Sequence, residues 1–119
     1  MRTLITKHIG NIIIITGVLH LMLGFFVNWQ TAMDMYRSGL VNTADQNVER
    51  FGFFWFQING LFVLFTGSFI QHYTTVSDKQ IPVRFGYYLL CIALIGCLLE
   101  PLSGFYLYAI LALFIIFQK

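Results

Sequence analysis

The sequence predicts an all-α integral membrane protein: an antiparallel four-helix bundle with one short interfacial helix in its first outer loop. Three observations lead to this prediction. Of the 119 residues, 58% are hydrophobic and only 10% are charged, and the apolar residues gather in four runs separated by polar ones. Soluble domains average about 25% charged residues. A chain this apolar cannot cover its own core with polar surface, so we expect lipid to cover it.

Residues 1–119 are expected to form a single domain. The expected transmembrane helices cover residues of about 9–27, 44–72, 84–99 and 102–117. The first two apolar runs meet the length of about 20 residues that a hydrocarbon layer of about 30 Å requires. The first run follows Arg2 and Lys7, as in a signal peptide, but no small-residue cleavage pattern follows it. We therefore expect that helix to be retained.

The last two apolar runs are shorter, and only Glu100-Pro101 separates them. One continuous helix through both runs would be far too long for a membrane, so a tight helical hairpin is the better interpretation. We expect Pro101 at the start of the fourth helix, where its missing N–H costs nothing.

Residues 28–50 are the one long connection. The stretches "TAMD" and "TADQ" predict helix starts, with Thr31 and Thr43 as N-caps. Ser38-Gly39 is a plausible stop between them. We expect the second long helix to begin near Ala44, after a short helix at the membrane surface. The residues of that short helix expected at the interface are Trp29, Met33, Tyr36 and Leu40.

The charge distribution predicts the orientation. With the N-terminus in the cytoplasm, basic residues divide five to two in favour of the inner side, as the positive-inside rule requires. The five inner residues are Arg2, Lys7, Lys79, Arg84 and Lys119. We expect a multi-pass protein of the bacterial inner membrane with both termini cytoplasmic. The net charge of +2 is small and dispersed, which argues against nucleic acid as a partner.

Gly10, Gly17 and Gly24 recur every seven residues in the first helix. Glycines at this interval lie on one face and let two helix backbones approach closely, so they predict a helix–helix packing face. His20 projects from the same face as Gly17 and Gly24.

Polar side chains inside membrane helices are costly and are therefore candidates for function. Counting the rise per residue places His20 about 10 Å and Asn59 about 12 Å below the outer surface, which predicts a polar cluster in the outer half of the bundle. His20 and Glu100 are the candidate catalytic acid–base pair. A structural alternative has His20 neutral and bonded to Asn59 or to a backbone carbonyl. The complete set of predicted ligand contacts is His20, Glu49, Arg50, Trp55, Gln57, Asn59 and Glu100.

Neither a metal nor a cofactor is expected. His8 and His72 lie at the cytoplasmic ends of the first two helices, far in depth from His20, and no HxxxH or HExxH spacing occurs. Cys91 and Cys97 are six residues apart and therefore point in different directions from a helix.

Two stretches carry a family resemblance: "ERFGFFWFQINGLFVLFTG" and "LEPLSGFYLYAILALF", joined by the proline of "KQIPVRFGYYLL". With these motifs the chain resembles a family of small bacterial four-helix membrane proteins of unknown function, over residues of about 49–117. The motif "HLMLG" is more loosely similar to DoxX-like proteins. The resemblance implies an antiparallel membrane bundle and brings no established activity.

The sequence favours a membrane protein that binds a lipid, a quinone, another apolar small molecule or a membrane partner through the outer-half polar cluster. One alternative is a membrane enzyme, such as an isomerase, that acts on a lipid-soluble substrate through His20 and Glu100. Another is a small multidrug-type transporter, although the first helix offers His20 where such transporters use a carboxylate. Membrane lipids are the expected partners, and a homo-oligomer is compatible with the sequence.

Overall fold

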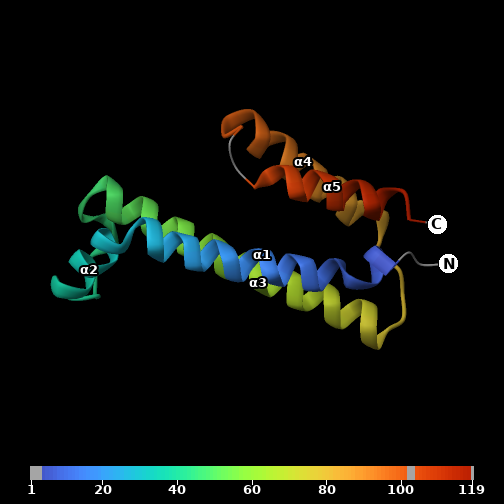
Figure 1. Cartoon of the computed structure of the whole chain (residues 1–119), viewed down its shortest axis with the longest axis horizontal. Coiled ribbons are helices and arrows are strands. Elements are labelled where there is room, and N and C mark those ends of the chain that lie inside the picture. Colours follow the sequence, from blue (N-terminus) through green and yellow to red (C-terminus); the bar gives the residue numbers. More distant parts are fainter. Residues whose placement is uncertain (1–3, 102–103, 119) are drawn as a thin grey trace. The chain divides into compact units, whose positions relative to one another are not determined.

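The computed structural model describes residues 4–101 and 104–118, and all regular structure in those ranges is helical (Figure 1). The elements are α1 (Leu4–Val27), α2 (Trp29–Arg37), the 3-10 turn η1 (Ala44–Gln46), α3 (Val48–Val76), α4 (Val83–Leu99) and α5 (Phe105–Ile116). The all-α prediction is confirmed for this part of the chain. The predicted helix start at residue 102, together with Arg2, Ser103 and Lys119, lies outside the described residues.

Two helices, α1 and α3, are long and apolar enough to cross a membrane, judged by length and composition. The helices α4 and α5 are apolar but shorter. Of the four membrane spans expected from the sequence, two therefore meet the length requirement among the described residues.

Contacts divide the chain into two compact units. The first, here called the α2 unit, is Asn11–Ser68 and holds α2, η1 and the greater part of α1 and α3. The second, here called the hairpin unit, consists of Met1–Gly10 and Phe69–Lys119, in which α4 and α5 pack against each other.

Within the α2 unit, α1 and α3 run side by side in opposite directions (Figure 1). Gly17 lies so close to α3 that a Cβ atom there would stand 2.9 Å from Leu64 Cγ and 3.0 Å from the Leu64 backbone nitrogen. A Cβ atom on Gly24 would stand 2.5 Å from Gln57 Nε2. The predicted glycine packing face is confirmed, since a larger residue would meet the α3 backbone at Gly17 and would have to displace the Gln57 and Phe56 side chains at Gly24.

Glycines also allow close helix packing in the hairpin unit. Gly10 in α1 lies directly against the backbone of Gln71 in α3. In the α4–α5 pair, Gly86 makes room for the side chain of Ile116, so that a Cβ atom there would stand 2.7 Å from Ile116 Cγ1.

Helix α4 agrees with its predicted range to within one residue, whereas α5 begins at Phe105 with Gly104 as its N-cap. The prediction that Pro101 starts the fourth helix is therefore wrong, because Pro101 lies in a turn ahead of that helix. The ring of Phe105 occupies the space where a Cβ atom on Gly96 would stand. The hairpin thus closes through a contact between a ring and a glycine, beyond the proline.

A single residue, Asn28, separates α1 from α2. Its side-chain amide donates to the Gly24 carbonyl (3.1 Å), and its own carbonyl accepts from the Ala32 N–H (2.9 Å). Helical hydrogen bonding resumes at once, so α2 begins at Trp29 and Thr31 lies inside it. The prediction of Thr31 as an N-cap is wrong for this reason.

The end of α2 follows the predicted stop. Ser38 is the C-cap, and Gly39 has a φ of +89°, a left-handed conformation that glycine adopts without steric cost. A short helix in the first connection is therefore confirmed, over residues 29–37. Of the side chains expected at a membrane surface, Trp29, Tyr36 and Leu40 are exposed and Met33 is half-buried. Leu40 lies beyond the end of α2, so its predicted place in that helix is wrong.

Helix α3 begins later than predicted. The turn η1 comes first, and Asn47 after it is extended, so α3 starts at Val48 rather than near Ala44. Asn47 Oδ1 accepts the backbone N–H of Arg50 at 2.8 Å, which is the hydrogen bond of a helix N-cap. Thr43, the predicted cap, makes no such bond, and its hydroxyl accepts from the Arg50 side chain instead.

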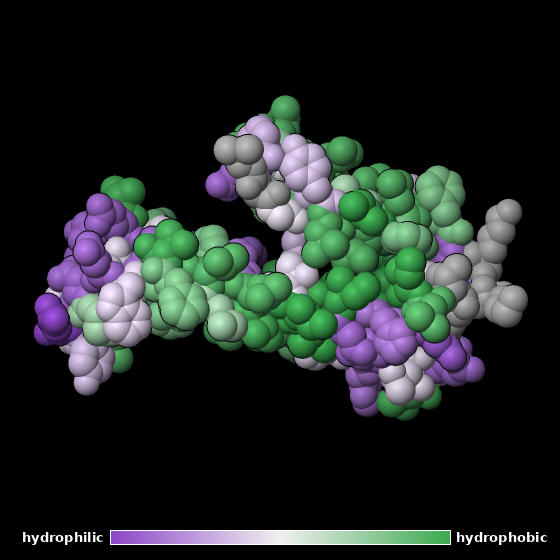
Figure 2. Space-filling view, in the orientation of Figure 1, coloured by the Kyte–Doolittle hydropathy of each residue, from purple (hydrophilic) through white to green (hydrophobic). Residues whose placement is uncertain are grey.

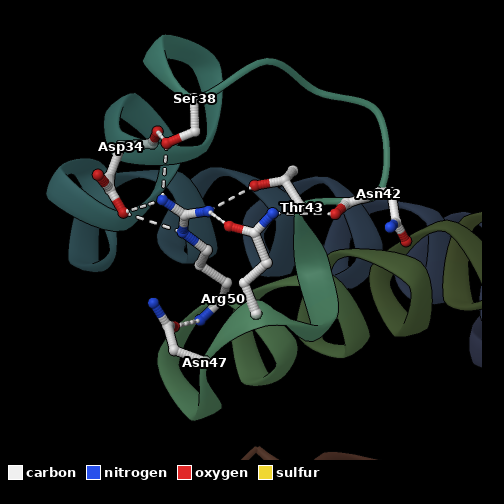
Figure 3. A network of polar contacts seen from close by, with 7 residues as sticks. Asp34, Ser38, Asn42, Thr43, Asn47 and Arg50 are labelled. Carbon is white, nitrogen blue, oxygen red and sulfur yellow. Dashed lines mark hydrogen bonds and ion pairs between the residues drawn. The ribbon is translucent and has the colours of Figure 1, made fainter.

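Arg50 joins α2, the following loop and α3 in one polar network (Figure 3). The arginine is only 6% exposed, and each of its five side-chain N–H groups has an acceptor. The acceptors are Asp34 Oδ2 for Nε and Nη2 (2.9 and 2.6 Å), Ser38 Oγ for Nη2 (2.8 Å), and Thr43 Oγ1 and Gln46 Oε1 for Nη1 (2.6 and 2.7 Å).

The ion pair alone contributes little to this network, because the Asp34 side chain is 59% exposed and water screens it. The stronger constraint comes from the guanidinium, since a buried charge without partners costs several kcal/mol. Arg50 therefore fixes the position of α2 relative to the first turn of α3.

The surface of the α2 unit divides by polarity (Figure 2). Hydrophilic residues gather over α2 and the loop that follows it, mixed with exposed apolar side chains such as Leu40 and Val41, whereas hydrophobic residues cover the adjoining parts of α1 and α3. Among these, Phe26 and Phe65 are 73% and 68% exposed. Large apolar side chains therefore face outward along both long helices.

Replacing Gly10 with alanine should lower the midpoint of thermal unfolding in detergent, followed by the helical circular-dichroism signal. The new Cβ atom would meet the Gln71 backbone, and overpacking of this kind costs about 1–3 kcal/mol. Gly52→Ala is the matched control, because a Cβ atom there meets nothing within 4 Å. The control should gain about 0.5–1 kcal/mol from helix propensity. Equal shifts in the two variants would contradict the close approach at Gly10.

Replacing Arg50 with lysine should destabilise the protein by about 1–3 kcal/mol, because an ammonium group cannot reach four acceptors that surround a planar guanidinium. Arg37→Lys, a change of the same kind at an exposed position of α2, should leave the unfolding midpoint unchanged. The measurement is thermal unfolding in the same detergent. If both lysine variants unfold with the wild-type protein, the network does not stabilise the fold.

Candidate functional site

His20 lies at the contact between α1 and α3. Its Nε2 atom is 3.0 Å from the backbone oxygen of Phe56, and because a carbonyl only accepts, Nε2 carries the proton. The imidazole also stacks on the Phe56 ring, with centroids 3.8 Å apart and an interplanar angle of 10°. Gly60 leaves room for this ring, since a Cβ atom there would stand 3.0 Å from His20 Cδ2. The partner of His20 is a backbone carbonyl rather than Asn59.

Gln57 makes a second side-chain hydrogen bond between α1 and α3. Its Nε2 atom donates to the Leu21 carbonyl at 3.4 Å, which is long for a hydrogen bond. Its Oε1 atom is buried and has no hydrogen-bond partner within the described residues. The structure therefore brings two members of the predicted cluster, His20 and Gln57, to one helix–helix contact, where each reaches a carbonyl of the opposite helix.

Other members of the predicted cluster lie elsewhere. Asn59 and Trp55 are on α3 with exposed side chains, and Trp55 makes edge contacts with the rings of Phe51 and Phe54. Glu100 is the exposed C-cap of α4 in the hairpin unit, and its backbone N–H donates to Gly96. Its pairing with His20 in acid–base chemistry stays a prediction.

Glu49 and Arg50 are neighbours in the chain, but they differ in exposure and in hydrogen bonding. The five N–H groups of Arg50 are all engaged by α2, the loop and η1, so none is left for a ligand. Glu49 is exposed in the first turn of α3, and within the described ranges it has neither a hydrogen bond nor an ion pair. Of this pair, only Glu49 has a side chain that is free to meet a ligand.

The α2 unit contains an open pocket of about 860 Å³ where α1 passes into α2 beside the start of α3. Its walls are residues 26–31 on one side and Val48, Glu49, Gly52, Phe53 and Phe56 on the other. Phe56 thus has two roles, since it lines this pocket and also stacks on His20. Among the predicted ligand contacts, Glu49 is the one that lines the pocket.

The other lining residues were not predicted as ligand contacts, although the sequence contains a signal for them. The stretch "FFVNWQT", residues 25–31, passes from aromatic to polar residues where the first apolar run ends. Gly52 lies one turn into α3, and a Cβ atom there would face open space. The pattern that indicates this pocket is a change from aromatic to polar residues at the end of one apolar run, together with a glycine near the start of the next helix.

Among the described residues, no three His, Cys, Asp or Glu side chains gather as a metal site would require. Cys91 is exposed and Cys97 is half-buried, and both are free thiols.

Comparison with known protein families matches residues 5–119 to a family described as of unknown function, DUF6463. Comparisons with curated proteins and with solved structures give no significant match. The family match covers nearly the whole chain and agrees with the resemblance to a family of unknown function that the motifs indicate. The chain therefore belongs to the family of unknown function DUF6463.

Proposed function

We propose that this protein is a multi-pass membrane protein that binds a lipid or another amphiphilic small molecule in the pocket of the α2 unit. The observation that supports the proposal is the pocket itself, an open volume of about 860 Å³ lined by both aromatic and polar residues. This volume falls within the range of about 300–1,000 Å³ that is typical of ligand sites.

Two features support the membrane location. The helices α1 and α3 have 24 and 29 residues, so they measure about 36 and 44 Å and exceed the hydrocarbon thickness of about 30 Å. Both also present large apolar side chains outward, such as Leu23 at 58% and Phe62 at 62% exposure. In water such surfaces would promote aggregation, whereas lipid covers them.

The proposed architecture is a single domain of four antiparallel spans in the bacterial inner membrane, with both termini in the cytoplasm. The loose resemblance of "HLMLG" to DoxX-like proteins would imply the same architecture. In this arrangement α2 and its loop lie outside, at the membrane surface. Helices α4 and α5, with 17 and 12 residues, measure about 26 and 18 Å. The hairpin therefore crosses only with help from flanking residues or local thinning of the bilayer.

The pocket suits an amphiphile because its walls differ in polarity. Phe26, Phe53 and Phe56 supply aromatic surface for an apolar tail, whereas Asn28 and Thr31 supply polar groups near the proposed membrane surface. We assign His20 to helix packing and to support of the Phe56 ring, because its Nε2 proton is used by a backbone carbonyl.

Site-directed labelling tests the topology. In a protein whose native cysteines are replaced by serine, Asp45→Cys should react with a membrane-impermeant maleimide in intact spheroplasts, and Lys79→Cys should react only after lysis. Glu100→Cys should react from outside if the α4–α5 hairpin crosses the membrane. Labelling of Lys79→Cys from outside would contradict the orientation. Protection of Glu100→Cys alone would show that the hairpin enters the membrane without crossing it.

Native mass spectrometry of gently extracted protein tests the pocket. The wild-type protein should retain a bound lipid or amphiphile, and Gly52→Leu should lose it, because the added side chain enters the pocket without meeting other atoms within 4 Å of its Cβ. Ser68→Leu, an exposed position of α3 outside the pocket, is the matched control and should retain the ligand.

His20→Ala separates the two candidate sites in the same experiment. Retention of the ligand by His20→Ala and its loss from Gly52→Leu support the pocket. The opposite result would refute the pocket and favour the cluster around His20.

A further inference from the structure

We propose that the pocket takes a monocationic amphiphile, in which an ammonium head is carried by a single apolar tail. This inference rests on the proposed function and names the ligand class of the same site. The charges and the aromatic residues around the pocket lead to it.

Charge gives the first constraint. Glu49 is the charged residue among the described residues that line the pocket, and no described group pairs with it. The neighbouring cation, Arg50, is 6% exposed and has every N–H engaged within the protein. It therefore offers no hydrogen bond to an anion. An unpaired carboxylate among the residues that line a pocket attracts a cation and repels an anion.

Aromatic residues give the second constraint. Phe26, Trp29, Phe53 and Phe56 all line the pocket, together with Glu49. The face of an aromatic ring carries negative charge and attracts cations, and aromatic cages are a recurrent way to bind quaternary ammonium groups. Asn28, Gln30 and Thr31 add neutral polar groups but no positive charge.

Among the described residues, the pocket lining has no positively charged side chain, and this favours a ligand with a single positive charge over a zwitterion. A phosphocholine or phosphoethanolamine head would bring a phosphate as well as an ammonium group. Phosphates in proteins are held by arginine, lysine or helix N-termini. The pocket lining supplies neither a lysine nor an arginine, and Glu49 in the first turn of α3 opposes an anion at that helix end.

Four amphiphiles with the same tail test the inference: tetradecyltrimethylammonium, tetradecylphosphocholine, tetradecyl maltoside and tetradecyl sulfate. Full-length protein with Trp55→Phe is titrated in dodecyl maltoside at low amphiphile concentration, and the fluorescence of Trp29 in the pocket reports binding. Circular dichroism confirms that the helices remain folded. The trimethylammonium compound should bind about tenfold more tightly than the maltoside.

Glu49→Gln should reduce that preference to within about twofold, whereas Asp45→Asn should keep it. Asp45 is an exposed carboxylate of η1 outside the pocket, so the control removes the same charge nearby. Comparing variants in the same micelles cancels the partitioning of each amphiphile into detergent.

The remaining outcomes separate the two proposals. Equal binding of all four compounds would overturn the cation preference and leave the amphiphile pocket standing. Equal binding of phosphocholine and trimethylammonium would replace the monocation by a zwitterionic head. If Asp45→Asn loses the preference for the trimethylammonium compound as Glu49→Gln does, the preference arises from long-range electrostatic attraction. That result would overturn a direct contact between the ligand and Glu49. Binding of none of the four would refute the proposed function itself.

Discussion

The close approach of α1 and α3 is the constraint on which the α2 unit depends. Gly17 and Gly24 bring the α1 backbone against the side chains of α3, and Gly60 does the same in the other direction. Because the two backbones are this close, a side chain as short as that of His20 can reach a carbonyl on the opposite helix. In a lipid environment, where apolar side chains gain little by leaving the solvent, such packing and hydrogen bonding would hold the helices together.

The Arg50 network holds α2 in place, a short helix that has few buried residues of its own. Of the residues of α2, only Ala32 is buried, so apolar packing cannot fix its position. A buried guanidinium can, because its donors lie in one plane and each must find an acceptor in a set direction. Three of its four partner side chains are neutral, and the single acidic one, Asp34, is largely exposed. The network therefore acts through geometry more than through charge.

Hydropathy predicted the helical class, the end of α1 and the range of α4, and the Ser38-Gly39 pair predicted the stop after α2, because these depend on the local sequence. Thr43 stands at the N-cap position of η1, as predicted, but makes no cap hydrogen bond. The error at Thr31 and this missing bond share one cause, since local capping patterns do not show what distant residues require. The Thr43 hydroxyl accepts from Arg50, and α2 starts early because Asn28 carries hydrogen bonds on both of its sides. A prediction based on neighbours along the chain cannot contain either fact.

The candidate site was less predictable than the fold. Polar residues within apolar runs directed attention to His20 and Gln57, which the structure places at a helix contact. The pocket instead arises where α1 passes into α2 at Asn28, a junction that the sequence marks only by a change from aromatic to polar residues. The prediction of a polar cluster used only the depth of each residue below the membrane surface, and it assumed that residues at the same depth face each other. Asn59 shows why this fails, because its side chain is exposed while that of His20 turns toward α3.

The one-residue junction at Asn28 has a consequence for how the sequence can change over evolution. Adding or deleting a single residue there would rotate α2 by about 100° around its axis. Asp34 and Ser38 would then point away from Arg50, whose network needs both. Between residues 24 and 38, members of the family should therefore differ freely in the type of exposed residues but keep the same length. Insertions should instead collect between Gly39 and Thr43, in the loop after α2, where the chain contributes a turn rather than a fixed helical register.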